Sequence, residues 1–210
     1  LITCVTEHHA ILDTAKHLEE NGYKVTYLTV NEFGEINLDE LKNSITDETV
    51  LISIMFANNE IGTIQNIAEI GKIAHEYDVL FHTDAAQALG HVPIDVKQMN
   101  IDLMSMSSHK IYGPKGIGAL YIRSILPRVK INSIVYGGGQ ERNIRSGTLN
   151  VPGIVGFAKA VEIAIDEMEA ENKKYKKWTG TMLEKLSAVG GKLNGHLSNR
   201  LSHNLNIRFD

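Results

Sequence analysis

Short apolar runs alternate with amphipathic segments through the first half of the chain. Apolar side chains recur every three or four positions in three segments, which predicts helices over Ala10–Asn21, Leu38–Ser44 and Ile67–Tyr77. The apolar runs between and after them predict strands over Leu1–Val5, Lys24–Val30, Val50–Phe56, Val79–Thr83, Asp102–Ser107 and Ile117–Arg123. Strands that are apolar on both faces and alternate with helices are typical of a mainly parallel sheet covered by helices. We therefore expect an α/β fold with a parallel or mixed sheet.

The second half of the chain follows a different pattern. Tyr136–Thr148 is rich in glycine and charge, which predicts a loop. Val151–Glu171 predicts one long helix, and the apolar positions from Trp178 to Leu186 either extend this helix or begin a second one. The last apolar run, Asn204–Phe209, predicts a strand.

These patterns suggest two domains. A long helix that leaves an α/β domain often leads into another domain, so we assign residues 1–150 to a large domain and residues 151–210 to the linking helix and the start of a small α+β domain. The chain begins and ends in predicted strands, and complete domains rarely do so. We therefore expect it to be part of a longer polypeptide.

Composition and charge exclude several classes of function. The 210 residues carry a net charge of −4 and no basic stripe, which argues against a nucleic-acid-binding role. No apolar run approaches the ~18 residues of a membrane span, and Leu1–Thr6 lacks the basic start and cleavage site of a signal peptide. The single cysteine, Cys4, excludes an internal disulfide and fits a reducing compartment. Its apolar surroundings indicate a buried packing residue rather than a reactive thiol.

The strongest chemical signal combines Asp84, Gln87 and Lys110. Asp84 follows one predicted strand and Lys110 follows the next, so both side chains should lie at the carboxyl edge of the sheet. A lysine amine that forms a Schiff base and a carboxylate that keeps a pyridine nitrogen protonated are what pyridoxal phosphate requires. Either residue alone would more simply be a surface lysine or a capping aspartate. The glycine-rich sequence from Tyr112 to Gly118 favours the cofactor, because glycines let the backbone approach a ligand closely.

His82 offers a competing interpretation. His82 and Asp84 share one face of a strand and could imitate metal ligands. The sequence has no third ligand at a spacing typical of zinc sites, so we expect no metal centre.

Several motifs resemble those of cysteine desulfurases, which are fold-type I pyridoxal-phosphate enzymes of the class-V aminotransferase group. They occur in the family's order and span nearly the whole chain: Thr6-Glu7-His8, Asn58-Asn59-Glu60-Ile61-Gly62, His82-Thr83-Asp84-Ala85-Ala86-Gln87, Ser107-Ser108-His109-Lys110-Ile111-Tyr112-Gly113-Pro114-Lys115-Gly116, Gly137-Gly138-Gly139-Gln140-Glu141-Arg142 and Arg145-Ser146-Gly147-Thr148. The resemblance is closest to the housekeeping branch, which serves iron–sulfur cluster assembly. It implies a PLP-transferase large domain.

The resemblance also implies a role for each motif residue. Lys110 would form the covalent link to the cofactor, and His8 would stack on the pyridine ring and move protons. The other expected cofactor contacts are Asn59 near the ring hydroxyl, Asp84 at the pyridine nitrogen, Gln87 at the phenolic oxygen, Ser107 and His109 at the phosphate, and Thr148 at the phosphate of a neighbouring subunit. A site shared in this way implies a homodimer. The alternatives are that Asn59 is a turn residue and that Gly137–Thr148 is an ordinary flexible loop, although Arg142 and Arg145 beside Thr148 suit a loop that meets an anion.

The resemblance implies that L-cysteine is converted to L-alanine and that sulfur is passed as an enzyme persulfide to an iron–sulfur scaffold or another acceptor protein. In the family, the attacking cysteine and the arginine that binds the substrate carboxylate lie downstream of this chain, and a phosphate-binding Gly/Thr turn lies upstream. Cys4 does not match the nucleophile, so we expect these residues alone to be inactive. Alternatives are another class-V enzyme, such as a selenocysteine lyase, and a non-catalytic scaffold. The expected location is the cytoplasm, or the mitochondrial matrix in a eukaryote.

Overall fold

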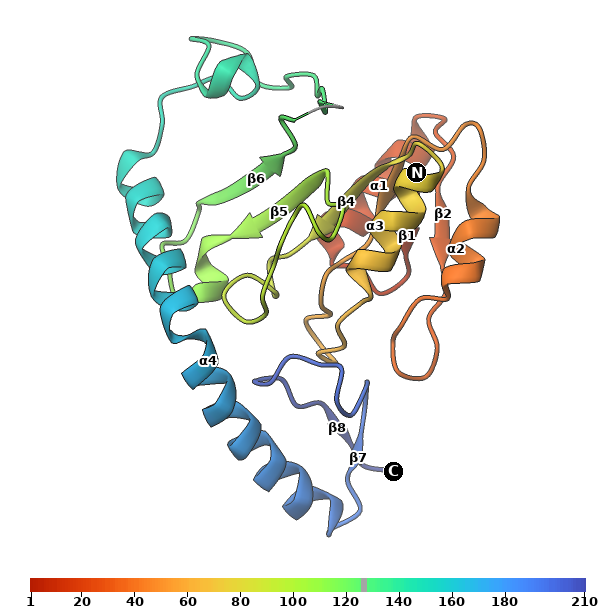
Figure 1. The fold of residues 1–210 in the computed structure, drawn as a ribbon, viewed down its shortest axis with the longest axis vertical. Helices are drawn as coiled ribbons and strands as arrows, with labels where there is room; N and C mark the ends of the chain where they lie inside the picture. The colour runs from red at the N-terminus through yellow and green to blue at the C-terminus, as the bar shows by residue number, and fades with distance from the viewer. Residues whose placement is uncertain (126–127) are drawn as a thin grey trace.

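The computed structural model describes residues 1–125 and 128–210. A six-stranded sheet with the strand order β2-β1-β3-β4-β5-β6 forms its centre (Figure 1). The strands are β1 (Ile2–Cys4), β2 (Thr26–Leu28), β3 (Leu51–Ser53), β4 (Leu80–Asp84), β5 (Leu103–Ser107) and β6 (Gly118–Ile122). Neighbours pair in parallel, except that β6 runs antiparallel to β5. The expected mixed, mainly parallel sheet is therefore confirmed.

The three helices of the first half lie where their periodicity predicts them. They are α1 (His9–Glu20), α2 (Leu38–Ser44) and α3 (Ile67–Glu76), each ending within a residue of its predicted bounds. Polar caps explain two of the starts. The ring of His8 accepts a hydrogen bond from the Ala10 N–H, and the Asn37 side chain accepts bonds from the first turn of α2.

Most predicted strands are longer than those observed, three of them by four residues. Val50–Phe56 is regular only over Leu51–Ser53, although the Ile54 and Phe56 amides still donate to β4 carbonyls at 3.1 and 2.9 Å. Lys24–Val30 is reduced to Thr26–Leu28. Asn204–Phe209 is reduced to β8 (Ile207–Arg208), which pairs with β7 (Lys192–Leu193), while the side chains of Asn204 and Asn206 bind the loop that follows β3.

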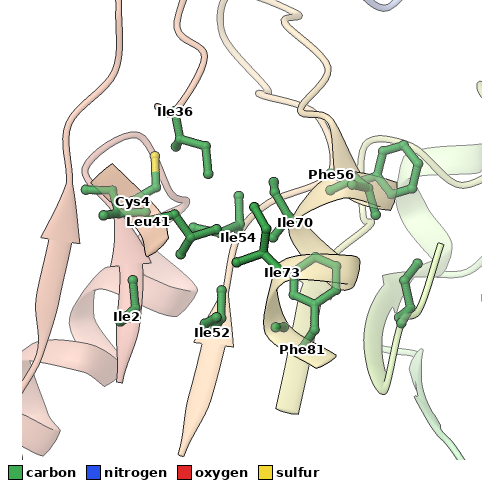
Figure 2. Packing of buried hydrophobic residues seen from close by; sticks show 14 of the residues in the cluster. Ile2, Cys4, Ile36, Leu41, Ile52, Ile54, Phe56, Ile70, Ile73 and Phe81 are labelled. Carbon is green, nitrogen blue, oxygen red and sulfur yellow. The ribbon is translucent and has the colours of Figure 1, made fainter. Parts of the chain in front are cut away.

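One side of the sheet carries the main hydrophobic core. Figure 2 shows side chains of β1 and β3 packed against those of α2 and α3, including Ile52, Leu41 and Ile70. Phe81 of β4 is fully buried in the same cluster. Cys4 is also fully buried there, as predicted for a packing residue. Burial raises the pKa of its thiol.

The second half contains one uninterrupted helix, α4 (Val151–Ser187), which runs along one side of the molecule to the small sheet (Figure 1). The open question of one helix or two is thus settled. Its first turns pack on the short helix η1 (Ser108–Ile111), where Phe157 contacts a cluster with Leu89 and Ile111. Before α4, Tyr136–Thr148 is irregular as predicted, apart from the short helix η2 (Glu141–Asn143). No described helix is long and apolar enough to cross a membrane.

Residues 196–206, which we call the return segment, lead back to the loop that follows β3. Arg200 forms an antiparallel bridge with Thr63, and the Leu201 amide donates to the Gly62 carbonyl at 2.9 Å. Leu201 is 1% exposed. The return segment therefore packs on the loop that follows β3.

Candidate active site

Four parallel strands place their carboxyl ends at one edge of the sheet. The register aligns Asp84 at the end of β4 with Ser105 of β5, and Lys110 follows in η1 directly after β5. The ends of β1 and β3 lead to His8 and Asn59 at the same edge. The sheet topology thus explains how residues far apart in sequence come together.

A cavity of about 280 Å³ lies at this edge. Its lining includes seven of the eight residues predicted from the sequence: His8, Asn59, Asp84, Gln87, Ser107, His109 and Lys110. The lining also includes Ala10, Met55, Ala57, Ala86, Ser105 and Met106, which the sequence did not single out. The convergence of Asp84 and Lys110 around one space matches the expectation from strand order.

Thr148 does not join this group. It is exposed in the irregular segment between η2 and α4 and does not line the cavity. Its role at the phosphate of a neighbouring subunit stays a prediction.

Asp84 is held by the start of the turn after β4. Its Oδ1 accepts a hydrogen bond from the Ala86 N–H at 2.9 Å, and the residue is half-buried. The bond fixes the rotamer of the carboxylate while Oδ2 stays available to a ligand. Gln87 lies in the same turn and also lines the cavity.

The ring of His8 has a defined orientation. Its Nδ1 accepts a hydrogen bond from the Ala10 N–H at 3.1 Å, which caps α1. A nitrogen that accepts a hydrogen bond carries no proton, so neutral His8 carries its proton on Nε2. His8 can therefore offer a donor to a ligand in the cavity while it caps the helix.

Ser107 and His109 form a polar pair beside Lys110. The Ser107 Oγ lies 2.9 Å from the His109 Nδ1, so one atom donates to the other. The following turn needs glycine at position 113, because a Cβ there would lie 2.2 Å from the Ser108 Oγ. The close turn holds η1, and with it Lys110, against the end of β5.

Glu7 is a buried carboxyl that sequence reasoning missed. It is 6% exposed, its Oε1 accepts from the Met55 N–H at 2.5 Å, and its buried Oε2 has no hydrogen-bond partner among the described residues. Burial, reinforced by the nearby Asp84 charge and partly offset by the Met55 bond, raises the pKa of Glu7 to about 8. A charged residue at the end of an apolar strand was the available signal.

His82 supports the floor of the site rather than a metal. Its Nδ1 lies 2.8 Å from the Ser53 Oγ and its Nε2 lies 2.9 Å from the Ser105 Oγ, so the side chain connects β3, β4 and β5. Both nitrogens are thus engaged, and burial lowers the pKa of the ring. Over residues 1–125 and 128–210, no three potential metal-ligating side chains cluster.

The cavity residues fit pyridoxal phosphate. Lys110 supplies an amine for its aldehyde, and Asp84, held at a rigid strand end, supplies a carboxylate for its pyridine nitrogen. Ser107 and His109 supply donors suited to a phosphate. This set matches the cofactor's three polar ends.

Comparison with known proteins agrees with this chemistry. The family model described as aminotransferase class-V matches residues 1–210. Proteins named cysteine desulfurase IscS, from Clostridium botulinum strain Hall and Methanosarcina thermophila, are each 54% identical over 100% of the chain. The match covers 53% and 52% of these two relatives, so the chain spans about half their length.

Solved structures show the same fold. A structure titled NifS-like protein matches 99% of the chain with a TM-score of 0.94 and 40% identity, over 57% of its own length. A second, titled SspA in complex with cysteine, matches 100% of the chain with a TM-score of 0.86 and 41% identity, over 58% of its length. These matches support the PLP-transferase architecture that the motifs implied.

Proposed function

Because the chain belongs to the class-V aminotransferase family, whose members depend on pyridoxal phosphate, we propose that its protein is a cysteine desulfurase. The protein would convert L-cysteine to L-alanine and keep the sulfur as a persulfide on a cysteine of its own. The observation that carries the proposal is that Asp84, Lys110 and five other motif residues line one and the same cavity. The relatives named cysteine desulfurase and the similar structure titled as a complex with cysteine support this choice of substrate.

The chain's residues would divide the work of binding. When bound, pyridoxal phosphate supplies an aldehyde that links to amines and a ring that stores an electron pair. Lys110 would hold the aldehyde until the substrate amine displaces it, and Asp84 would keep the ring nitrogen protonated. Ser107 and His109 would hold the phosphate, while Asn59 and Gln87 would contact the ring oxygen.

His8 would contribute to proton movement. Its Nε2 carries the proton of the neutral ring, because Nδ1 is occupied by the Ala10 N–H. Over the whole reaction the substrate C–S bond breaks, an S–S bond forms on the enzyme, and a proton ends on the former sulfur-bearing carbon. We propose that His8, which lines the cavity, gives such a proton and takes one back.

Cys4 cannot be the sulfur acceptor. Cys4 is fully buried, so a substrate cannot reach it. Burial also raises the pKa of its thiol, which disfavours the thiolate that attacks sulfur. We propose that the accepting cysteine belongs to a part of the protein outside these 210 residues and that the residues alone do not complete the reaction.

The assembly and location follow the same proposal. We propose a homodimer in which Thr148 serves the partner's cofactor, and an iron–sulfur scaffold or another acceptor protein that takes the sulfur. The reaction needs no nucleic acid and no membrane. The cytoplasm, or the mitochondrial matrix of a eukaryote, suits an unpaired buried cysteine.

The test uses the purified full-length protein. Incubation with cysteine and a reductant should give alanine and sulfide in equal amounts, and borohydride should fix the cofactor covalently on Lys110. Lys110→Arg keeps the positive charge but should abolish both results, because a guanidinium does not form this link. If the protein releases selenium from selenocysteine but no sulfur from cysteine, it is a selenocysteine lyase instead. Trapping on Lys115, or cofactor-free inactive protein, would contradict the proposal.

A further inference from the structure

The loop that carries Asn59 is held from two directions. Within the large domain, the Asn58 Oδ1 accepts from the amides of Glu60 and Ile61, each at 2.9 Å, and its Nδ2 donates to the Thr6 carbonyl at 3.0 Å. These bonds connect the turn to the segment that carries His8. They leave the carbonyls of Asn59 and Glu60 available to other donors.

The return segment supplies those donors. The Asn204 Nδ2 donates to the carbonyls of Asn59 and Glu60 at 3.3 and 3.1 Å, and the Asn206 Nδ2 donates to Glu60 at 3.2 Å. Asn204 lies 145 positions from Asn59 in the sequence. The contact is therefore a tertiary one that links two distant parts of the chain.

Arg200 fixes the orientation of the Asn204 amide. Its Nη2 donates to the Asn204 Oδ1 at 3.1 Å and to the Asn204 carbonyl at 2.7 Å. Because Oδ1 accepts from a guanidinium, the amide must turn its Nδ2 toward the Asn59 loop. The side chain thus has one orientation that satisfies all its partners.

Gly62 adapts the loop to this contact. Its φ is +77°, and a Cβ at this position would lie 2.8 Å from the Asn204 Oδ1. Glycine permits both the left-handed backbone and the close approach of Asn204. The Asn59 loop and the return segment are therefore complementary in shape at Gly62.

We propose that Asn204 is a positioning residue, which sets the place of Asn59 in the cofactor cavity through the backbone of the Asn59 loop. The inference rests on the proposed function only in that Asn59 faces a bound cofactor there. Asn204 does not line the cavity itself, so it acts through the loop. Movement of the return segment would then change the contact that Asn59 makes.

The decisive variant is Asn204→Asp in the full-length protein. Aspartate keeps the volume and can still accept from Arg200, so the return segment should stay folded. It loses the donors to the two carbonyls and places a carboxylate against them. The matched control is Asn199→Ala, which removes an amide donor to the Ile64 carbonyl from the same segment without touching the Asn59 turn.

Three measurements compare the variants. The absorbance spectrum of the resting, cofactor-loaded protein and its pH titration report on the ring contacts. Hydrogen exchange at residues 58–62 reports on the loop itself, and kcat and KM report on turnover. Asn204→Asp should shift the spectrum in the same direction as Asn59→Ala, speed exchange of the loop, and lower kcat ~10-fold, as misplacement of a site residue does. Asn199→Ala should leave the spectrum and kcat unchanged.

A double variant tests whether Asn204 acts through Asn59. In Asn59→Ala protein, adding Asn204→Asp should change neither the spectrum nor kcat further. Additive effects, or a lower melting temperature with an unchanged spectrum and kcat, would show a merely structural tie and overturn the inference. If the wild type binds cofactor but does not desulfurate cysteine, the proposed reaction fails, and the spectral comparison still decides the role of Asn204.

Discussion

Replacing Glu7 with glutamine should remove a pH-dependent loss of stability. Glu7 is 6% exposed and bonds the Met55 amide through Oε1, while Oε2 finds no partner among the described residues. A protonated carboxyl is favoured at this position, because its carbonyl oxygen still accepts the hydrogen bond from the Met55 amide and no charge is buried. Glutamine has the same shape and the same acceptor but cannot ionise. Glu7→Gln thus imitates the protonated form at every pH.

The expected magnitude follows from the pKa of Glu7. Burial raises this pKa from its ordinary value of 4.5 to about 8 in the folded protein. Between these two pH values the folded state retains a proton that the unfolded state releases, so stability falls as pH rises. At about 1.4 kcal/mol for each pH unit of pKa difference, the total loss is on the order of 4–5 kcal/mol, fully present above pH ~8 and absent below pH ~4.5.

Urea denaturation between pH ~4 and ~9 measures this effect, because these pH values bracket the window of ~4.5–8 in which stability should change. The free energy of unfolding of wild type should fall relative to that of Glu7→Gln as pH rises, and the difference should level off above pH ~8. The exposed carboxylate Glu20 provides a control, and Glu20→Gln should follow wild type at every pH. If wild type and Glu7→Gln lose stability in parallel, the neutral buried carboxyl is refuted.

Three other substitutions test separate parts of the structure. Asp84→Asn should keep the cofactor covalently bound but remove most alanine formation, since a neutral amide cannot hold the ring nitrogen protonated; near-normal turnover would contradict this role. Thr148→Ala should speed cofactor loss on dialysis, and an active protein that sediments as a monomer would contradict the shared site. Asp102 is fully buried, is paired with Arg123 at 2.9 Å and His75 at 3.1 Å, and directly precedes β5, whose other end, at Ser107, lines the cavity. Asp102→Ala should lower the free energy of unfolding by ~3–5 kcal/mol in urea denaturation, because it leaves the largely buried Arg123 guanidinium without its carboxylate, and a loss under ~1 kcal/mol would refute that account.

Much of the fold could be predicted because its elements carry their own local signals. α3 has a clear apolar face, and its buried residues are the ones that its periodicity selects. Strand ends were less predictable. The apolar run Val50–Phe56 does not reveal that regular pairing stops at Ser53, because the irregular continuation is equally buried. The sequence also did not decide whether residues 151–187 form one helix or two, because the charged stretch in the middle of α4 is compatible with both.

The candidate site was predictable for a different reason. Asp84 and Lys110 follow neighbouring parallel strands, so topology alone brings them to one edge of the sheet. Ser105 was missed, although a serine in an apolar strand two positions before Ser107 shares its face. The sequence places His82 on the same strand face as Asp84, but its two serine partners come from neighbouring strands, and pairing register is needed to identify them.

The contact between Asn204 and Asn59 shows where sequence reasoning ends. Asparagines are common in turns, and Asn204 and Asn206 lie in a run that predicts a strand, so the sequence indicates no particular partner for their side chains. Their side chains bind backbone carbonyls of the loop. Every residue has such a carbonyl, so the sequence of the loop does not show which one is bound. Only Gly62 carries a signal, and glycine in a turn has many explanations. A cavity whose catalytic groups follow from strand order can therefore be positioned by residues that strand order does not reveal.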